Sequence, residues 1–288
     1  FVLLPGYEPL IDMADIIKVD FRITADPEER KSMREILPKH VRLLAEKIET
    51  EEEFQQALEY GYVLFQGYFF CKPAVLHQKR LTSNALSKIR LLREINQPNV
   101  NFSSITGVIS SDTNLVHKLL TYINSAGIGL TNHVSNLKQA TVLLGASGVR
   151  RWVTLVSLQT FSEDKPPELF TLSLLRAKFC ELIAQSLKRP GVTPDTGFLL
   201  GIFSLLDVLL SLPMEDVLKE VALADDLNAA LLGEDNDLRH ILDLVVAYER
   251  GDWDTVISCC ELLKISPDRM KPTYDAVLEW YNILQTLS

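Results

Sequence analysis

The chain has 288 residues, of which 47% are hydrophobic and 23% charged, and its formal net charge is −9 at pH 7. This length predicts two domains with packed cores. The negative charge argues against a nucleic-acid binder that neutralises phosphates, although a local pocket could still hold a small anionic ligand. The four cysteines have neither metal-site nor disulfide spacing, which indicates a reducing cytoplasm.

The sequence shows neither a secretory signal nor a convincing membrane-spanning segment. The chain opens without the basic segment of a secretory signal, and its longest apolar stretch, residues 197–212, is interrupted by Asp207. That stretch is too short to span a bilayer comfortably, so we expect a buried core helix there. We therefore expect a cytoplasmic protein that does not contact a membrane.

Residues 1–80 alternate short apolar runs with polar helical stretches. Strands are expected at 1–4, 15–20, 41–47 and 62–70, separated by helices at 9–14, 27–37 and 50–61. Thr50 followed by Glu53 is a capping box, and Gly61 marks the expected end of that helix. Strands separated by helices predict a parallel sheet of βαβ units. Four such units are about half of a TIM-type barrel.

From Leu81 onward, apolar residues recur at helical spacing without strand-like alternation. Helices are expected at 83–96, 101–112, 114–127, 137–145, 149–161, 169–189, 197–210, 214–221, 238–251, 252–264 and 272–287. Asn136 and Ser147 stand where helix caps are expected, and Gly145 where a helix would end. Residues 81–288 are therefore predicted to form an all-α domain.

Three segments of the first domain carry a specific pattern, namely IKVD at 17–20, AEKIET at 45–50 and FQGYFFCKP at 65–73. In this order they resemble the closing half of EAL-type cyclic di-GMP phosphodiesterase domains. The resemblance implies that Lys18, Asp20, Glu46 and Gln66 are relic positions of that family's site. In active members, the lysine and glutamate at these positions help to orient and activate the attacking water beside two divalent cations.

The chemistry of that resembled site is incomplete in this chain. Two-metal hydrolysis needs several carboxylates that hold the cations about 4 Å apart. The family supplies most of them from the first half of its barrel, and neither Glu-Ala-Leu nor Asp-Asp-Phe precedes Lys18. Glu46 and Asp20 alone cannot hold two metals. We therefore expect no catalytic residue, no metal and no cofactor, with retained nucleotide binding, or catalysis completed by upstream sequence, as alternatives.

The second domain carries another motif. Residues 112–115 (DTNL) run into Asn124, Ser125 and Ala126, and LKQA and LLG follow at 137–145. This order is similar to the signature of HDOD domains, which are relatives of HD-type metal phosphohydrolases that lack the metal ligands. An HD site needs an adjacent His-Asp pair, and none of the five histidines is followed by aspartate. We therefore expect no HD hydrolase activity.

Together these observations predict an α/β partial TIM-type barrel, the EAL remnant at 1–80, followed by a larger all-α HDOD domain at 81–288, as in bacterial EAL–HDOD signal transduction proteins. We expect a regulatory adaptor that is not an enzyme and acts through an unknown protein partner of the HDOD domain. The alternative is a cyclic di-GMP receptor or weak phosphodiesterase completed by upstream sequence. Open strand edges also favour a homodimer. Cyclic di-GMP is a candidate ligand, whereas nucleic acid and membranes are not expected partners.

Overall fold

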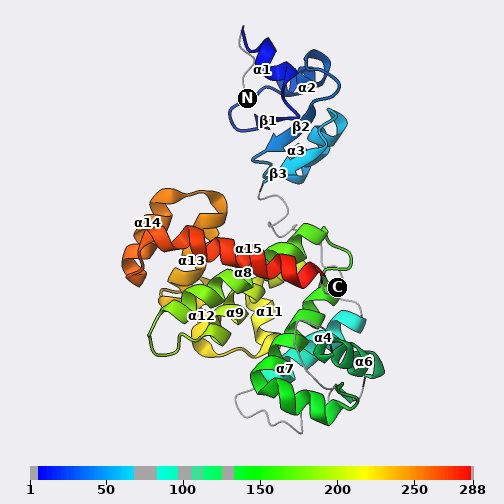
Figure 1. Cartoon of the computed structure of the whole chain (residues 1–288), viewed down its shortest axis with the longest axis vertical. Helices are drawn as coiled ribbons and strands as arrows, with labels where there is room; N and C mark the ends of the chain where they lie inside the picture. The colour runs from blue at the N-terminus through cyan, green and yellow to red at the C-terminus, as the bar shows by residue number, and fades with distance from the viewer. Residues whose placement is uncertain are drawn as a thin grey trace. The chain divides into compact units, whose positions relative to one another are not determined.

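The computed structural model describes residues 6–67, 83–96, 106–107, 109–110, 112–124 and 133–286. The chain divides into two compact units, which we call the sheet unit, Phe1–Lys72, and the helical unit, Pro73–Ser288 (Figure 1). Each unit is described by itself below. The domain boundary expected at residue 80 falls outside the described residues.

The sheet unit alternates helices with strands along the chain. Its elements are α1 (Glu8–Asp12), β1 (Ile16–Asp20), α2 (Pro27–Ile36), β2 (Arg42–Glu46), α3 (Glu51–Glu59) and β3 (Leu64–Gln66). The three strands form one parallel sheet in the order β1-β2-β3. The strand expected at residues 1–4 lies outside the described residues. Thr50 caps α3 by accepting the N–H of Glu53, and Gly61 follows the helix at φ 83°, as expected.

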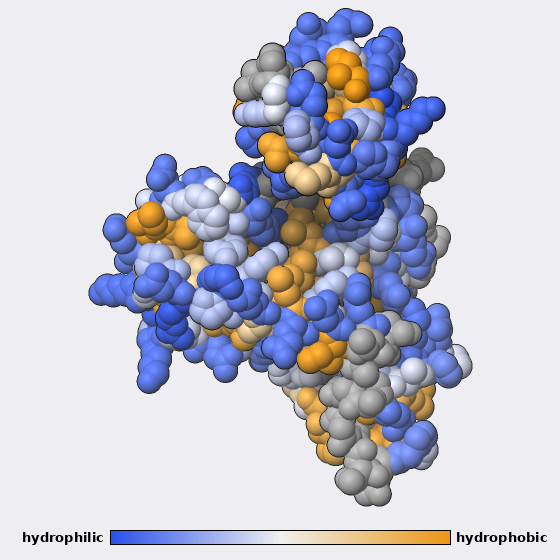
Figure 2. Space-filling view, turned by 45° about the horizontal axis from the view of Figure 1, so that its top comes forward, coloured by the Kyte–Doolittle hydropathy of each residue, from blue (hydrophilic) through white to orange (hydrophobic). Residues whose placement is uncertain are grey.

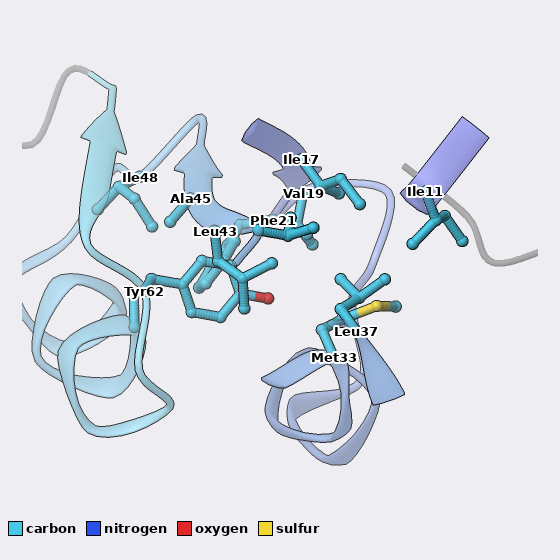
Figure 3. Close-up of a cluster of buried hydrophobic side chains, with 12 residues drawn as sticks. Ile11, Ile17, Val19, Phe21, Met33, Leu37, Leu43, Ala45, Ile48 and Tyr62 are labelled. Carbon is cyan, nitrogen blue, oxygen red and sulfur yellow. The ribbon is translucent and has the colours of Figure 1, made fainter. Parts of the chain in front are cut away.

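One face of the sheet is packed against a hydrophobic core. The buried side chains of this core are Ile11, Ile17, Val19, Phe21, Met33, Leu37, Val41, Leu43, Ala45, Ile48, Ala57 and Tyr62. Figure 3 shows Met33 of α2 and Leu37, which directly follows α2, directed toward the side chains of the strands. The inward positions of β1 and β2 are Ile17, Val19 and Leu43, among others, because successive strand residues point to opposite faces.

The opposite face of the sheet carries charged residues, which contradicts the expected partial TIM-type barrel. The sheet of the described residues is small, with three short strands, and Lys18 and Glu46 project from the face that the core does not cover. The prediction took each apolar run for a strand buried on both faces. In β1 and β2, however, charged residues alternate with the core positions, which is the pattern of a sheet with one covered face.

The described residues of the helical unit form helices and no strand. They are α4 (Ser83–Asn96), α6 (Thr113–Ile123), α7 (Leu137–Phe161), α8 (Pro167–Ser186), α9 (Pro194–Phe203), α10 (Leu206–Leu210), α11 (Met214–Val221), α12 (Asp225–Leu232), α13 (Asp237–Arg250), α14 (Trp253–Leu263), the 3₁₀ turn η2 (Pro267–Arg269) and α15 (Met270–Thr286). Most of the helix expected at 101–112 lies outside the described residues.

Helix α7 joins two of the expected helices. Asn136 caps its start by accepting the N–H of Gln139 at 2.8 Å, as expected. Gly145 interrupts the helix with φ 69° and ψ 175°, a conformation that favours glycine. Ser147 does not cap a second helix, because its hydroxyl donates to the carboxylate of Asp195 instead. The sequence therefore predicted the position of the break correctly, but it did not predict that the two helical segments continue across it as one kinked helix.

Helices α8 and α9 approach each other closely at two glycines. A Cβ atom on Gly197 would lie 2.6 Å from the carbonyl oxygen of Cys180, and one on Gly201 would lie 2.4 Å from that of Arg176. Residues 197–203 of α9 are all buried, as expected, but the single helix expected at 197–210 is interrupted at Ser204 and Leu205, where α9 ends and α10 begins. None of the described helices combines the length and the apolar character that crossing a membrane requires. The face shown in Figure 2 is mostly hydrophilic, with smaller hydrophobic patches.

A buried ion pair ties α8 to α13. The guanidinium of Arg176 donates to both carboxylate oxygens of Glu249, at 3.0 and 2.7 Å, and the two side chains are only 4% and 9% exposed. The remaining nitrogen of Arg176 donates to the Ser204 hydroxyl, which terminates α9. This fixed geometry satisfies the buried charges of both partners.

Candidate functional site

The four predicted site residues lie together at the carboxyl ends of the strands. The register pairs Asp20 with Glu46 and Glu46 with Gln66, so these residues form one row across the sheet. Lys18 precedes Asp20 by two residues and therefore projects from the same face. We call Lys18, Asp20, Glu46 and Gln66 the strand-end row.

Two ion pairs involve residues of the strand-end row. Lys18 Nζ lies 2.9 Å from Glu46 Oε1, and the two side chains are 48% and 25% exposed. Lys47 Nζ lies 2.7 Å from Asp20 Oδ2, and Asp20 is only 8% exposed. The exposed pair is available to a ligand, whereas the Asp20 carboxylate is largely enclosed by the protein.

The Asp20 carboxylate is held in its charged form. Its Oδ1 atom accepts the backbone N–H groups of Arg22 at 2.8 Å and Ile23 at 3.3 Å. Burial raises the pKa of Asp20, but the hydrogen bond from Lys47 and the two backbone N–H groups outweigh it, so the pKa is below its ordinary value. The hydrogen bond to Asp20 likewise raises the pKa of Lys47.

The turn after β2 is shaped by the left-handed backbone of Lys47 and by the close approach of Gly67, which follows β3. Lys47 adopts φ 61°, a left-handed conformation that costs free energy in residues other than glycine. The next residue, Ile48, donates its N–H to the carbonyl oxygen of Gln66 at 3.1 Å. Gly67 fits closely against this turn, since a Cβ atom there would lie 2.1 Å from the Ile48 carbonyl oxygen. These contacts join the ends of β2 and β3 and aim Lys47 at Asp20.

A further group of ion pairs, centred on Arg22, lies beside the row, and the sequence did not predict it. Arg22 Nη2 contacts both carboxylate oxygens of Glu53, at 3.0 and 2.9 Å, and Arg22 Nε lies 3.4 Å from Glu49. Glu53 Oε2 also accepts the N–H of Glu49 at 2.8 Å. The only sequence signal was Glu53 itself, which was interpreted as part of a capping box with Thr50.

The chemical capacity of the strand-end row follows from its polar groups. Lys18 can donate to an anion, and the carboxylates can accept N–H groups. Gln66 is exposed and can do both. Within the described residues, no group of three or more histidine, cysteine, aspartate or glutamate side chains could hold a metal ion.

The predicted signature of the second domain has structural roles. Asp112 caps α6 by accepting the N–H groups of Asn114 and Leu115, and it forms an ion pair with Lys88 of α4 at 3.1 Å. Asn124 accepts the N–H of Val134 and donates to the Val134 carbonyl oxygen, each at 2.8 Å. These residues therefore fix the ends of α6 relative to α4 and to the segment that leads into α7.

A comparison with protein-family models matches the HDOD domain at residues 84–227, which is half of the chain. The match includes the capping Asp112 and the bridging Asn124. The chain therefore belongs to the HDOD family.

Two curated relatives extend the match across both units. An uncharacterized protein, YuxH from Bacillus subtilis (strain 168), is 35% identical over 277 residues, which are 95% of this chain and 66% of YuxH. The cyclic di-GMP phosphodiesterase CdgJ from Vibrio cholerae is 34% identical over 262 residues, which are 90% of this chain and 60% of CdgJ. The chain thus spans less than two thirds of the length of either relative.

A comparison with solved structures matches a chain from Marinobacter aquaeolei VT8 that is described as a candidate signal transduction protein. The TM-score is 0.47 at 12% identity, and the match covers 92% of this chain and 88% of that one. A likeness at this level carries no argument about fold or function.

Besides the partial barrel, two further expectations from the sequence are wrong. The resemblance of residues 1–80 to an EAL domain is not supported, because the family comparison finds an HDOD domain and no EAL domain. Within the described residues, the three segments form the carboxyl ends of three short parallel strands and the turn at Lys47. Residues 68–73 of the third segment lie outside the described residues.

The expectation that the chain is not an enzyme is also wrong, because it does not follow from the residues of this chain. It rested on the absence of metal ligands from this sequence. CdgJ is named a phosphodiesterase, and this chain spans only 60% of its length. The absence of metal ligands from a chain of this extent therefore does not exclude phosphodiesterase activity.

Proposed function

We propose that this chain acts in cyclic di-GMP signalling, with the sheet unit contacting the nucleotide and the helical HDOD unit contacting a protein partner. The observation that carries the proposal is the match to CdgJ. It covers 90% of this chain and therefore extends from the helical unit into the sheet unit. Membership of the HDOD family supports a signalling role for the helical unit.

The strand-end row is the proposed nucleotide contact. Ligands of open parallel sheets bind outside the carboxyl ends of the strands, which is where the row lies. Cyclic di-GMP presents anionic phosphodiesters and guanine N–H groups. Lys18, which is 48% exposed, can exchange Glu46 for a phosphate oxygen, and the released Glu46 carboxylate can then accept guanine N–H groups.

The helical unit offers exposed apolar side chains for the partner. Val142 and Leu143 are adjacent in α7 and 64% and 52% exposed, and Leu86 of α4 is 44% exposed. Helices α4 and α7 pack together within the unit. Exposed apolar surface of this kind supports a protein-binding role.

Binding of cyclic di-GMP to the full chain, measured by isothermal titration calorimetry, tests the nucleotide contact. We expect a saturable isotherm that Lys18→Gln weakens by about tenfold or more, because the variant loses a hydrogen bond between charged groups worth roughly 1.5–3 kcal/mol. Lys31→Gln is the matched control, since Lys31 is an exposed lysine on α2 of the same unit. Absence of saturable binding, or equal weakening by both variants, would overturn the proposal.

Hydrolysis of cyclic di-GMP is a second candidate function, which the name of CdgJ favours. Chromatography of the nucleotide after incubation with the full chain and Mg²⁺ or Mn²⁺ tests it. A linear dinucleotide product that disappears in Glu46→Gln but persists in Glu59→Gln would support catalysis at the strand-end row. Glu59 is an exposed glutamate at the end of α3 and serves as the control. Saturable binding without product would leave the receptor role as the better account.

A further inference from the structure

A groove lies in the helical unit between the last turns of α8 and the start of α15. Its volume is about 590 Å³, which falls within the ~300–1,000 Å³ range of small-molecule sites. We call it the α8–α15 groove and define it by Leu182, Ile183, Gln185, Ile265, Arg269 and Met270. It is distant in sequence from the HDOD signature and from the strand-end row, and neither role assigned above uses it.

The floor of the groove is apolar and well fixed. Ile183, Ile265 and Met270 are 1%, 8% and 2% exposed. Lys264 ends α14 in a left-handed conformation at φ 58°, so that the chain reverses and η2 leads directly into α15. This turn brings Ile265 and Met270 against the side of α8. An apolar group of a ligand would gain burial on this floor without a rearrangement of the backbone.

The charge at the groove is positive, in contrast to the chain as a whole, whose net charge is −9. Among the described residues that line the groove, Arg269 alone is charged, and its exposed guanidinium has no ion pair within the described part of the chain. Lys264 directly precedes Ile265, and Lys188 follows α8. Arg189 is paired with Asp237, and its Nη2 donates to the Leu262 carbonyl oxygen at 2.9 Å, which ties the end of α14 to the segment that follows α8.

We propose that the α8–α15 groove binds a small amphiphilic carboxylate. The apolar chain or ring of the ligand packs on Ile183, Ile265 and Met270, and its carboxylate pairs with the Arg269 guanidinium, which can donate two parallel hydrogen bonds. The exposed amide of Gln185 is a further donor at the rim. The groove is thus an input site of the helical unit, separate from the nucleotide contact proposed for the sheet unit.

Methionine methyl resonances of the full chain give a direct test, with dodecanoate as the probe. The chain has four methionines, and Met270 alone lies in the groove, whereas Met33 and Met214 lie in other elements. Dodecanoate should shift the Met270 resonance saturably and leave those of Met33 and Met214 in place. Arg269→Gln should weaken dodecanoate about tenfold, a difference of ~1.4 kcal/mol, and should leave the binding of uncharged dodecanol unchanged.

The control variant is Lys271→Gln. Lys271 is exposed, does not line the groove and is paired with Asp275 at 2.8 Å, so its loss should not alter dodecanoate binding. Three results would overturn the proposal: no saturable shift at Met270, shifts of equal size at Met33 and Met214, or equal weakening by Arg269→Gln and Lys271→Gln.

Discussion

One ion pair in each unit of this protein shows how differently such pairs are placed. In the sheet unit, Lys18 and Glu46 meet on an uncovered face and remain 48% and 25% exposed. In the helical unit, Arg176 and Glu249 meet between helices and are 4% and 9% exposed. Exposed pairs contribute little to stability and can exchange partners, whereas breaking a buried pair leaves an uncompensated charge. The difference teaches that burial decides whether a charge pair serves binding or structure.

The largest expected effect is the loss of the buried pair. Glu249→Ala leaves the buried Arg176 guanidinium without its carboxylate partner. This should lower the free energy of unfolding of the helical unit by about 3–5 kcal/mol. Urea denaturation followed by tryptophan fluorescence measures this, because all three tryptophans, Trp152, Trp253 and Trp280, lie in the helical unit.

Glu279→Ala is the control for that substitution, since Glu279 is an exposed glutamate of α15. A Glu249→Ala variant whose unfolding midpoint matched that of the control would contradict the structural role assigned to the buried pair.

The next largest effect is a loss of stability in one unit at a time, caused by replacing a closely packed glycine of that unit. Gly201→Ala places a Cβ atom 2.4 Å from the Arg176 carbonyl oxygen, and Gly67→Ala places one 2.1 Å from that of Ile48. Each substitution should cost about 1–3 kcal/mol in its own unit. Tryptophan fluorescence reports the helical unit, and the methyl resonance of the buried Met33 reports the sheet unit. If either alanine destabilised both units equally, the division into two units would not describe their stability.

The smallest effect is the pH dependence of the sheet unit. The pKa of Asp20 is below its ordinary value of 3.8, so the Asp20–Lys47 pair stabilises the folded state fully above that pH. This stabilisation is lost as the pH falls below 3.8 toward the pKa of the folded state. The Met33 resonance should show acid unfolding that is less pH-dependent in Asp20→Asn. Identical acid profiles for the two proteins would show that Asp20 is not held in its charged form.

The sequence located several features because their causes are local. Thr50 and Asn136 act as caps where the pattern placed them, and their partners lie only three residues away. The alignment of Asp20, Glu46 and Gln66 in one row was likewise accessible, because the carboxyl ends of parallel strands meet at one edge. The motif that identified the HDOD family also depends on short-range contacts, such as the cap at Asp112.

Other features depend on contacts that no local pattern encodes. Arg176 and Glu249 are 73 residues apart, and only the packing of α8 against α13 brings them together. Lys47 reaches Asp20 because its backbone is left-handed, which its residue type does not predict. The half-barrel was predicted wrongly because apolar runs were weighed more heavily than the charged residues alternating with them.

Hydrogen exchange of the full chain, with and without cyclic di-GMP, tests the assignment of nucleotide binding to the sheet unit most directly. The backbone N–H groups of Arg22 and Ile23 donate to Asp20, and that of Ile48 donates to Gln66, so all three lie beside the strand-end row. The account predicts slower exchange at these amides when the nucleotide is present, and unchanged exchange along α8 and α13. Slowing confined to the helical unit, or none in either unit, would contradict it.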